Sequence, residues 1–129
     1  MKLTLDVENT TTKRDGKLHL DPFEPDNSLT MIGMLNDQGV ERLVTFDHSE
    51  VEADDFGHTV VQEWLDKTTV LIMHNAAYDL LWLWESGFKY DGPVFDTMLG
   101  EYVLQRGIKE PLSLEACAER YELDTKKQD

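Results

Sequence analysis

The sequence contains a single cysteine and few basic residues for its length. Cys117 has no second cysteine with which to form a disulfide within the chain, so a disulfide-stapled fold is excluded and a reducing compartment is favoured. Lysine and arginine number 12 against 26 aspartates and glutamates, which gives a formal net charge of −14. The chain therefore lacks the general basic surface of most nucleic-acid-binding proteins, and contact with a polyanion is expected only at a small, specialised site.

Long hydrophobic runs are also absent. No stretch approaches the roughly 18–20 apolar residues of a membrane span, so no membrane contact is predicted. Met1 and Lys2 lead directly into a strand pattern without a signal peptide, which predicts a cytoplasmic protein. A length of 129 residues with 40% hydrophobic and 29% charged residues is typical of one globular domain, covering 1–129, with a modest core.

The first third of the chain has the patterns of strands. Residues 2–8 alternate apolar and polar side chains, which predicts a half-buried strand. Residues 9–27 have the composition of a loop, in which 18–20 could form a short strand. Residues 29–35 and 40–46 are apolar-rich and are separated by a four-residue turn, which predicts a hairpin. We therefore expect the chain to open with three antiparallel strands.

The remainder alternates helices and strands. Apolar spacing and capping residues predict a helix around 60–65, a strand over 69–73, a helix over 76–85, a strand at 94–95, and two helices that begin at Asp96 and Ser113 and end near Gly107 and Tyr121. Three antiparallel strands followed by alternating helices and strands indicate an α/β fold, with a mixed sheet and helices packed on its faces.

Three carboxylates are expected to meet at one edge of this sheet. Asp6 and Glu8 are two residues apart on the first strand and therefore share a face. Asp79 lies in the first turn of the helix that follows the buried strand 70–73, where its carboxylate is expected to be exposed at the carboxyl edge of the sheet, and Asn75 is placed as the N-cap of that helix. Because adjacent carboxylates repel unless a cation lies between them, the pattern predicts a site for Mg²⁺ or Mn²⁺.

Each of these residues also has an ordinary structural explanation. Asp6 and Glu8 could be the solvated face of a strand, and an acidic residue such as Asp79 is favoured in a first helical turn by the helix dipole. Tyr78 could simply pack against the core. Asp96 follows a strand as well, and we interpret it as a helix cap or a support for the metal ligands rather than as a ligand. The combination of residues at this spacing favours the metal site.

Two short motifs in this region resemble those of the DEDD 3′–5′ exonucleases. Residues 6–8 (Asp-Val-Glu) are similar to the first motif of that family, Asp-x-Glu, and residues 75–79 (Asn-Ala-Ala-Tyr-Asp) are similar to the second, Asn-x-x-Tyr/Phe-Asp. Residues 94–99 and 111–121 resemble the sequence that follows in the proofreading domain of phage-type family-A DNA polymerases. The resemblance spans nearly the whole chain and implies a ribonuclease-H-like fold.

The resemblance also implies a reaction and roles for the site residues. Hydrolysis of 3′-terminal phosphodiesters in that family uses two divalent ions, Mg²⁺ or Mn²⁺, roughly 3.5–4 Å apart. Asp6 would bridge both ions, Glu8 would hold the ion on the side of the nucleophile, and Asp79 would hold the other. Asn75 and Tyr78 would contact the substrate, the 3′ end of single-stranded DNA, in a bacterial or phage-infected cell.

The fourth carboxylate of the family has no counterpart in this sequence. It belongs to a Tyr-x-x-x-Asp or His-x-x-x-Asp motif, but Tyr121 is followed four residues later by Thr125, and neither Asp124 nor Asp129 has a Tyr or His four residues before it. We therefore expect the N-terminal part of an exonuclease domain. A polymerase domain or a partner chain would supply the missing Asp, and a polymerase domain would supply most of the affinity for DNA.

Two other functions are compatible with the same residues. The chain could be a catalytically inert module that retains the fold and binds nucleic acid or another protein. It could instead be an RNA 3′ exonuclease similar to ribonuclease D, because that branch shares the two motifs. Assays for Mn²⁺ binding and for cleavage of DNA and RNA separate the three.

Overall fold

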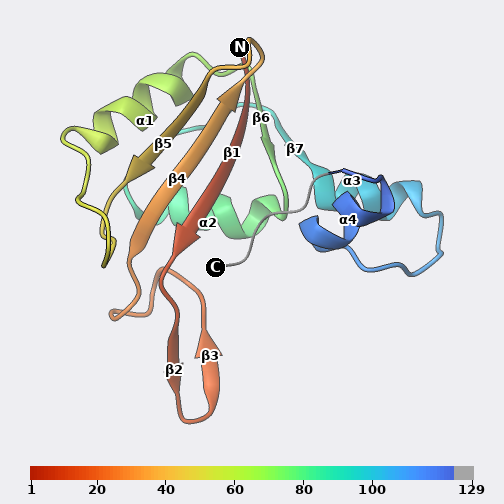
Figure 1. Cartoon of the computed structure of the whole chain (residues 1–129), viewed down its shortest axis with the longest axis horizontal. Helices are drawn as coiled ribbons and strands as arrows, with labels where there is room; N and C mark the ends of the chain where they lie inside the picture. The colour runs from red at the N-terminus through yellow and green to blue at the C-terminus, as the bar shows by residue number, and fades with distance from the viewer. Residues whose placement is uncertain (124–129) are drawn as a thin grey trace.

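The computed structural model describes residues 1–123, which fold around a five-stranded sheet (Figure 1). The sheet order is β5-β4-β1-β6-β7, with bounds β1 Lys2–Asn9, β4 Leu29–Asn36, β5 Glu41–Thr45, β6 Val70–Met73 and β7 Val94–Asp96. β4 pairs antiparallel with both β1 and β5, whereas β6 runs parallel to β1 and β7 runs parallel to β6. The predicted α/β class, the three antiparallel strands and the mixed sheet are confirmed.

Four helices are present in the part of the chain that the structure describes: α1 Gly57–Asp66, α2 Ala76–Glu85, α3 Thr97–Leu104 and α4 Leu114–Arg120. Helices α1 and α2 cover one face of the sheet, and α3 and α4 lie beside β7 (Figure 1). Asp96 and Ser113 cap α3 and α4 with their side chains, as predicted. No helix within residues 1–123 is both long enough and apolar enough to cross a membrane.

The alternation of side chains along β1 sets the position of the core. Every second residue of this strand is buried on the face covered by α1 and α2, and the residues between them are exposed on the other face. The buried set includes Leu3, Leu5 and Val7 of β1, Ile32 and Met34 of β4, Val61 and Leu65 of α1, and Trp82 and Leu83 of α2. The face that α1 and α2 do not cover therefore carries the polar side chains of β1.

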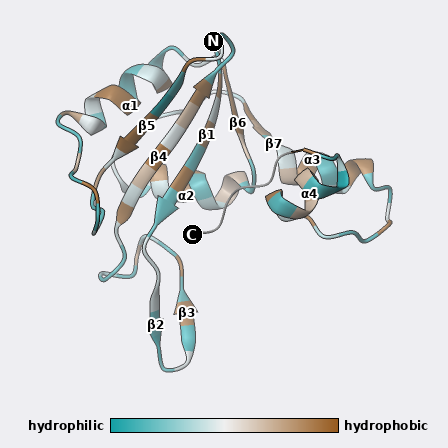
Figure 2. Cartoon of the chain, in the orientation of Figure 1, coloured by the Kyte–Doolittle hydropathy of each residue, from teal (hydrophilic) through white to brown (hydrophobic). Residues whose placement is uncertain are grey.

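A separate hairpin extends past the end of β1 and is largely hydrophilic (Figure 2). It consists of β2 Thr12–Arg14 and β3 Lys17–His19, joined by Asp15 and Gly16 with positive φ angles of 54° and 76°. Two central residues with positive φ are typical of the tightest hairpin turns. The sequence indicated a short strand at 18–20 in a loop, but β2 was not predicted because it has no apolar alternation.

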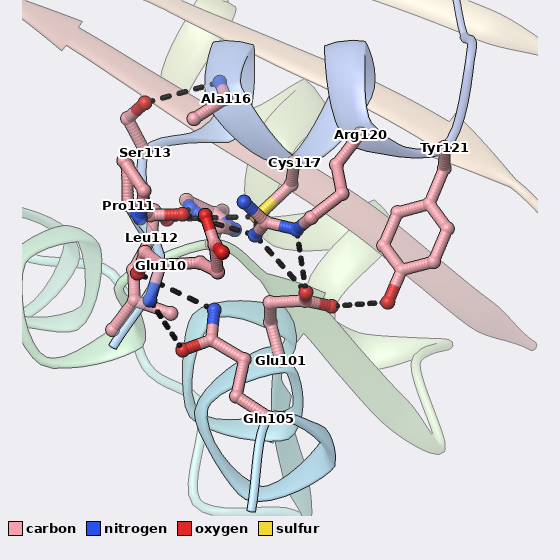
Figure 3. Close-up of polar contacts among 11 residues, drawn as sticks. Glu101, Gln105, Glu110, Pro111, Leu112, Ser113, Ala116, Cys117, Arg120 and Tyr121 are labelled. Carbon is pink, nitrogen blue, oxygen red and sulfur yellow. Dashed lines mark hydrogen bonds and ion pairs between the residues drawn. The ribbon is translucent and has the colours of Figure 1, made fainter. Parts of the chain in front are cut away.

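Helices α3 and α4 are held together around the buried carboxylate of Glu101 (Figure 3). Its Oε1 accepts a hydrogen bond from Arg120 Nε at 3.1 Å, and its Oε2 accepts one from the Tyr121 hydroxyl at 2.6 Å. Arg120 also donates to the Pro111 carbonyl at 2.9 Å. The Tyr121 hydroxyl, together with Arg120, holds the pKa of Glu101 below its usual range although burial opposes this. The network ties α4 to α3.

Arg120→Met is expected to lower the temperature of thermal unfolding. The substitution leaves the buried Glu101 carboxylate without its cationic partner, which is the costly way to break a buried ion pair. The matched control is Arg106→Met, because Arg106 is exposed. Differential scanning fluorimetry of the three proteins at one pH checks the expectation, and equal losses in both variants would contradict it.

Candidate active site

Asp6 and Glu8 lie on the sheet face that α1 and α2 do not cover, near the end of β1. Both side chains are exposed, whereas Val7 between them is buried on the opposite face, as the alternation predicted. Asp6 is paired with Gly33 of β4. It lines an open hollow of about 560 Å³ over β1, β4 and β5, whose other walls include Gly33 and Leu43. Since Gly33 has no side chain, the surface beside Asp6 stays open.

Asp79 approaches the same end of β1 from the covered face. β6 pairs with β1 at Lys2, Leu3 and Thr4, and it ends at Met73. The chain then enters α2, so the start of this helix follows the point where the pairing stops. Four residues at helical spacing form the buried face of α2, namely Ala76, Asp79, Trp82 and Leu83. The Asp79 side chain is therefore directed inward, and the residue is only 4% exposed.

The electrostatic environment of Asp79 is unfavourable to its charge. The pKa of Asp79 is raised from 3.8 to about 7, first by burial and then by the negative charges of Asp6 and Asp96, while a hydrogen bond from the Val7 N–H opposes the rise. One carboxylate oxygen, Oδ2, is buried and has no hydrogen-bond partner among residues 1–123. A buried carboxylate oxygen that lacks a partner and lies close to another carboxylate suits a hard divalent cation. The cation would offset both the cost of burying the charge and the repulsion between the two carboxylates. The donor atoms at this position therefore fit a metal ion.

The three predicted carboxylates do not form a closed cluster. Within residues 1–123, no group of three or more His, Cys, Asp or Glu side chains is arranged to hold a metal ion. Asp6 and Asp79 are close enough to interact, and Glu8 shares the exposed face of β1 with Asp6. Asp124 and Asp129 lie outside the described residues.

Asn75 does not cap α2 with its side chain, so that prediction was wrong. The residue occupies the N-cap position, but its backbone is left-handed, with φ 64° and ψ 61°, and the side chain makes no capping hydrogen bond. An ordinary N-cap has an extended backbone that directs its side chain at the first turn, and the left-handed conformation removes that geometry. The Asn75 side chain is instead exposed at the start of the helix.

The hydroxyl of Tyr78 is used within the fold. It donates to Asn9 Oδ1 at 2.7 Å and lies 3.0 Å from the carbonyl oxygen of Leu20, which also accepts a hydrogen bond from Trp82 Nε1 at 3.1 Å. Tyr78 and Trp82 thereby fix the segment around β2 and β3 onto α2. No pattern in the sequence predicted the Leu20 contact. Contact of Tyr78 with a substrate stays a prediction.

A small cavity of about 210 Å³ lies on the other side of Asp6, between β1, β6 and the starts of α3 and α4. His74 lines it, with Nδ1 2.9 Å from Thr97 Oγ1 and Nε2 2.6 Å from the Leu112 carbonyl oxygen. Both ring nitrogens are thus engaged with the protein, so His74 joins the end of β6 to the first residue of α3 and to the segment that precedes α4.

The sequence also matches a known family over most of its length. Residues 19–129 match the model of a family described as 3′–5′ exonuclease. The chain belongs to this 3′–5′ exonuclease family. Asn75, Tyr78 and Asp79 of the exonuclease domain lie inside the matched range, whereas Asp6 and Glu8 lie before it. No curated protein matches the sequence.

Several solved structures share the fold of the exonuclease domain. Brucella melitensis NrnC with bound Mg²⁺ is 19% identical, with a TM-score of 0.66 over 99% of this chain and 57% of that one. The same protein bound to pGG is 21% identical, with a TM-score of 0.66 over 99% and 56%. The family B DNA polymerase of the hyperthermophilic archaeon Pyrobaculum calidifontis is 14% identical, with a TM-score of 0.62 over 96% and 18%. The predicted ribonuclease-H-like fold is confirmed, and the chain spans little more than half the length of NrnC.

Proposed function

We propose that this exonuclease domain removes nucleotides from the 3′ end of single-stranded DNA in a metal-dependent reaction, as the proofreading part of a DNA polymerase. The observation that carries the proposal is the buried carboxylate of Asp79, which has one unpartnered oxygen and interacts with Asp6. NrnC with bound Mg²⁺ and a family B DNA polymerase share the fold, which supports a metal-dependent reaction and a polymerase context.

Asp6 and Asp79 would hold one or two divalent ions, Mg²⁺ or Mn²⁺, with Glu8 as a further ligand from the exposed face of β1. When bound, such ions lower the pKa of an attacking water and stabilise the leaving oxygen. Burial of Asp79 against the sheet keeps its carboxylate out of water and so strengthens its attraction to a cation. A fourth carboxylate would come from a polymerase domain or a partner chain.

The surroundings of Asp6 offer room for the end of a nucleic acid strand. The hollow of about 560 Å³ beside Asp6 is within the size range of pockets that hold small ligands. Asn75 is exposed at the start of α2, where its amide could donate a hydrogen bond to the substrate. With a net charge of −14, the domain would repel the phosphates of the strand except at the metal site. A polymerase partner would therefore supply most of the affinity for DNA.

Cleavage of matched DNA and RNA oligonucleotides tests the proposal. With millimolar Mn²⁺ we expect stepwise shortening of 5′-labelled single-stranded DNA from its 3′ end. Asp6→Ala should lower the rate at least about a hundredfold, because loss of even an indirect support of a metal ligand can cost that much. Glu63→Ala is the matched control, since Glu63 is exposed on α1 and should leave the rate unchanged.

Three results would contradict parts of the proposal. Faster cleavage of RNA than of DNA would favour the ribonuclease alternative. A folded domain that neither cleaves either strand nor binds Mn²⁺ at high Mn²⁺ would favour an inert module that retains the fold. Cleavage that is equally fast in Asp6→Ala and in the wild type would show that Asp6 takes no part in the reaction.

A further inference from the structure

Asp96 lies where two helices begin. It is the last residue of β7 and the N-cap of α3, where Oδ1 accepts the N–H groups of Met98 at 2.9 Å and Leu99 at 3.4 Å. The same carboxylate also accepts the N–H groups at the start of α2, that of Asn75 on Oδ1 at 3.0 Å and that of Ala76 on Oδ2 at 3.0 Å. One side chain therefore satisfies backbone donors of both helices.

Helix α2 depends on this contact because its own N-cap residue does not supply one. Asn75 has a left-handed backbone and no capping hydrogen bond from its side chain. The positive ends of two helix dipoles also meet at Asp96 and favour its charge. Burial acts against the charged form, but the four N–H donors together hold the pKa of Asp96 below its usual range. The carboxylate is thus ionised, and both of its oxygens are occupied by the backbone.

The contact with α2 is one helical turn from Asp79. Ala76 and Asp79 are three residues apart on the buried face of α2, so the position of the Ala76 amide fixes where the Asp79 carboxylate lies relative to β1. We propose that Asp96 is a positioning residue that orients Asp79 toward Asp6 by holding the first turn of α2 against the end of β7. The inference rests on the proposed function of Asp79 as a metal ligand. Asp96 itself would not bind the ion.

Asp96→Asn separates the two roles of the side chain. Asparagine is as good an N-cap as aspartate, so its Oδ1 can still accept the amides of Met98 and Leu99. Its NH₂ group would then face the Ala76 N–H, which places a donor against a donor. The start of α2 should loosen while α3 stays intact. Asp96→Ser, which can cap α3 but has no second oxygen for Ala76, serves as a second variant.

Hydrogen exchange and Mn²⁺ affinity together test the inference in the full chain. For Asp96→Asn we expect amide exchange in residues 75–79 to become about tenfold faster, with little change in residues 99–104. We expect the affinity for Mn²⁺, measured by calorimetry, to fall about 10–100-fold, as for other residues that orient metal ligands. Ser113→Ala is the matched control, because it removes the cap of α4, where Ser113 Oγ accepts from the Ala116 amide at 3.1 Å. It should change neither measurement.

The possible failures can be told apart. A folded wild type that does not bind Mn²⁺ would overturn the proposed function and the inference with it. If the wild type binds Mn²⁺ and Asp96→Asn binds it equally tightly, the inference alone is overturned. Unchanged exchange in residues 75–79 of both Asp96 variants would also overturn it, whatever the affinity for Mn²⁺.

Discussion

Asp79→Asn is expected to make the metal-free protein more stable at about pH 8 while it abolishes cleavage of a 3′ end. The wild-type carboxylate is buried beside Asp6, and one of its oxygens has no partner. The asparagine has nearly the same shape without the charge. The variant should therefore lose the electrostatic penalty of the folded state, and it should also lose the group that we propose as a metal ligand.

The pH dependence of this gain follows from the raised pKa of Asp79. Because the folded protein disfavours the ionised form, stability from this group is greatest below about pH 4 and is lost as the pH rises through 7. A rise from 3.8 to about 7 corresponds to at most about 4 kcal/mol in the free energy of unfolding above pH 7. Urea denaturation of the wild type and Asp79→Asn in EDTA, at about pH 5 and pH 8, measures the difference in the free energy of unfolding.

The matched control for this experiment is Glu63→Gln, which removes one exposed negative charge from α1. It should change the free energy of unfolding little at either pH. If Asp79→Asn were less stable than the wild type at pH 8, the buried carboxylate would be stabilised by a contact that outweighs its burial. Full cleavage activity in Asp79→Asn would show that Asp79 is not part of the proposed active site.

Mn²⁺ is expected to raise the unfolding temperature of the wild type at about pH 8 and to have little effect at about pH 5. A cation at a hundred times its Kd stabilises the folded state by about 2.7 kcal/mol. For a domain of this size, that amounts to roughly 10 °C. At pH 5 a pKa of about 7 keeps Asp79 protonated, and a protonated carboxyl is a poor ligand. Thermal unfolding with and without Mn²⁺ at the two pH values checks this.

The acidity of the chain makes a control necessary here. Divalent cations also associate loosely with a protein of net charge −14, without a built site. Asp79→Asn should lose the Mn²⁺ effect at pH 8, whereas Glu63→Gln should keep it. Equal stabilisation of the wild type and Asp79→Asn would show that the ion binds elsewhere on the surface.

The sequence was sufficient where local patterns decide the structure. The alternation along β1 predicted that Asp6 and Glu8 would share the exposed face, and the strand-to-helix transition predicted Asp79 in the first turn of α2. These features depend on residues within a few positions of one another. The burial of Asp79 was not predicted, because its carboxylate was expected to be exposed at the sheet edge, whereas it lies on the buried face of α2 with Ala76 and Trp82 and is only 4% exposed.

Contacts between distant residues were beyond such patterns. Asn75 has the side chain of a good N-cap, and no local signal shows that Asp96, 21 residues later, binds its amide instead. The carbonyl of Leu20 carries no sequence signature at all, although it accepts a hydrogen bond from Trp82 and lies 3.0 Å from the Tyr78 hydroxyl. The burial of Glu101 likewise depends on Arg120, which lies on another helix. Tertiary partners decided each of these cases.

The anchoring of Leu20 has a consequence for motion. Tyr78 and Asp79 are adjacent residues of the same helical turn, and Tyr78 contacts Leu20, which follows β3. A protein or strand that displaced this hairpin would break the contact of Tyr78 with Leu20, on the turn that bears Asp79, and the hydrogen bond of Trp82 to Leu20 on the next turn. Opening of the hairpin and fraying of the first turn of α2 should therefore be one cooperative fluctuation, so that a crosslink across the hairpin would also rigidify the position of Asp79.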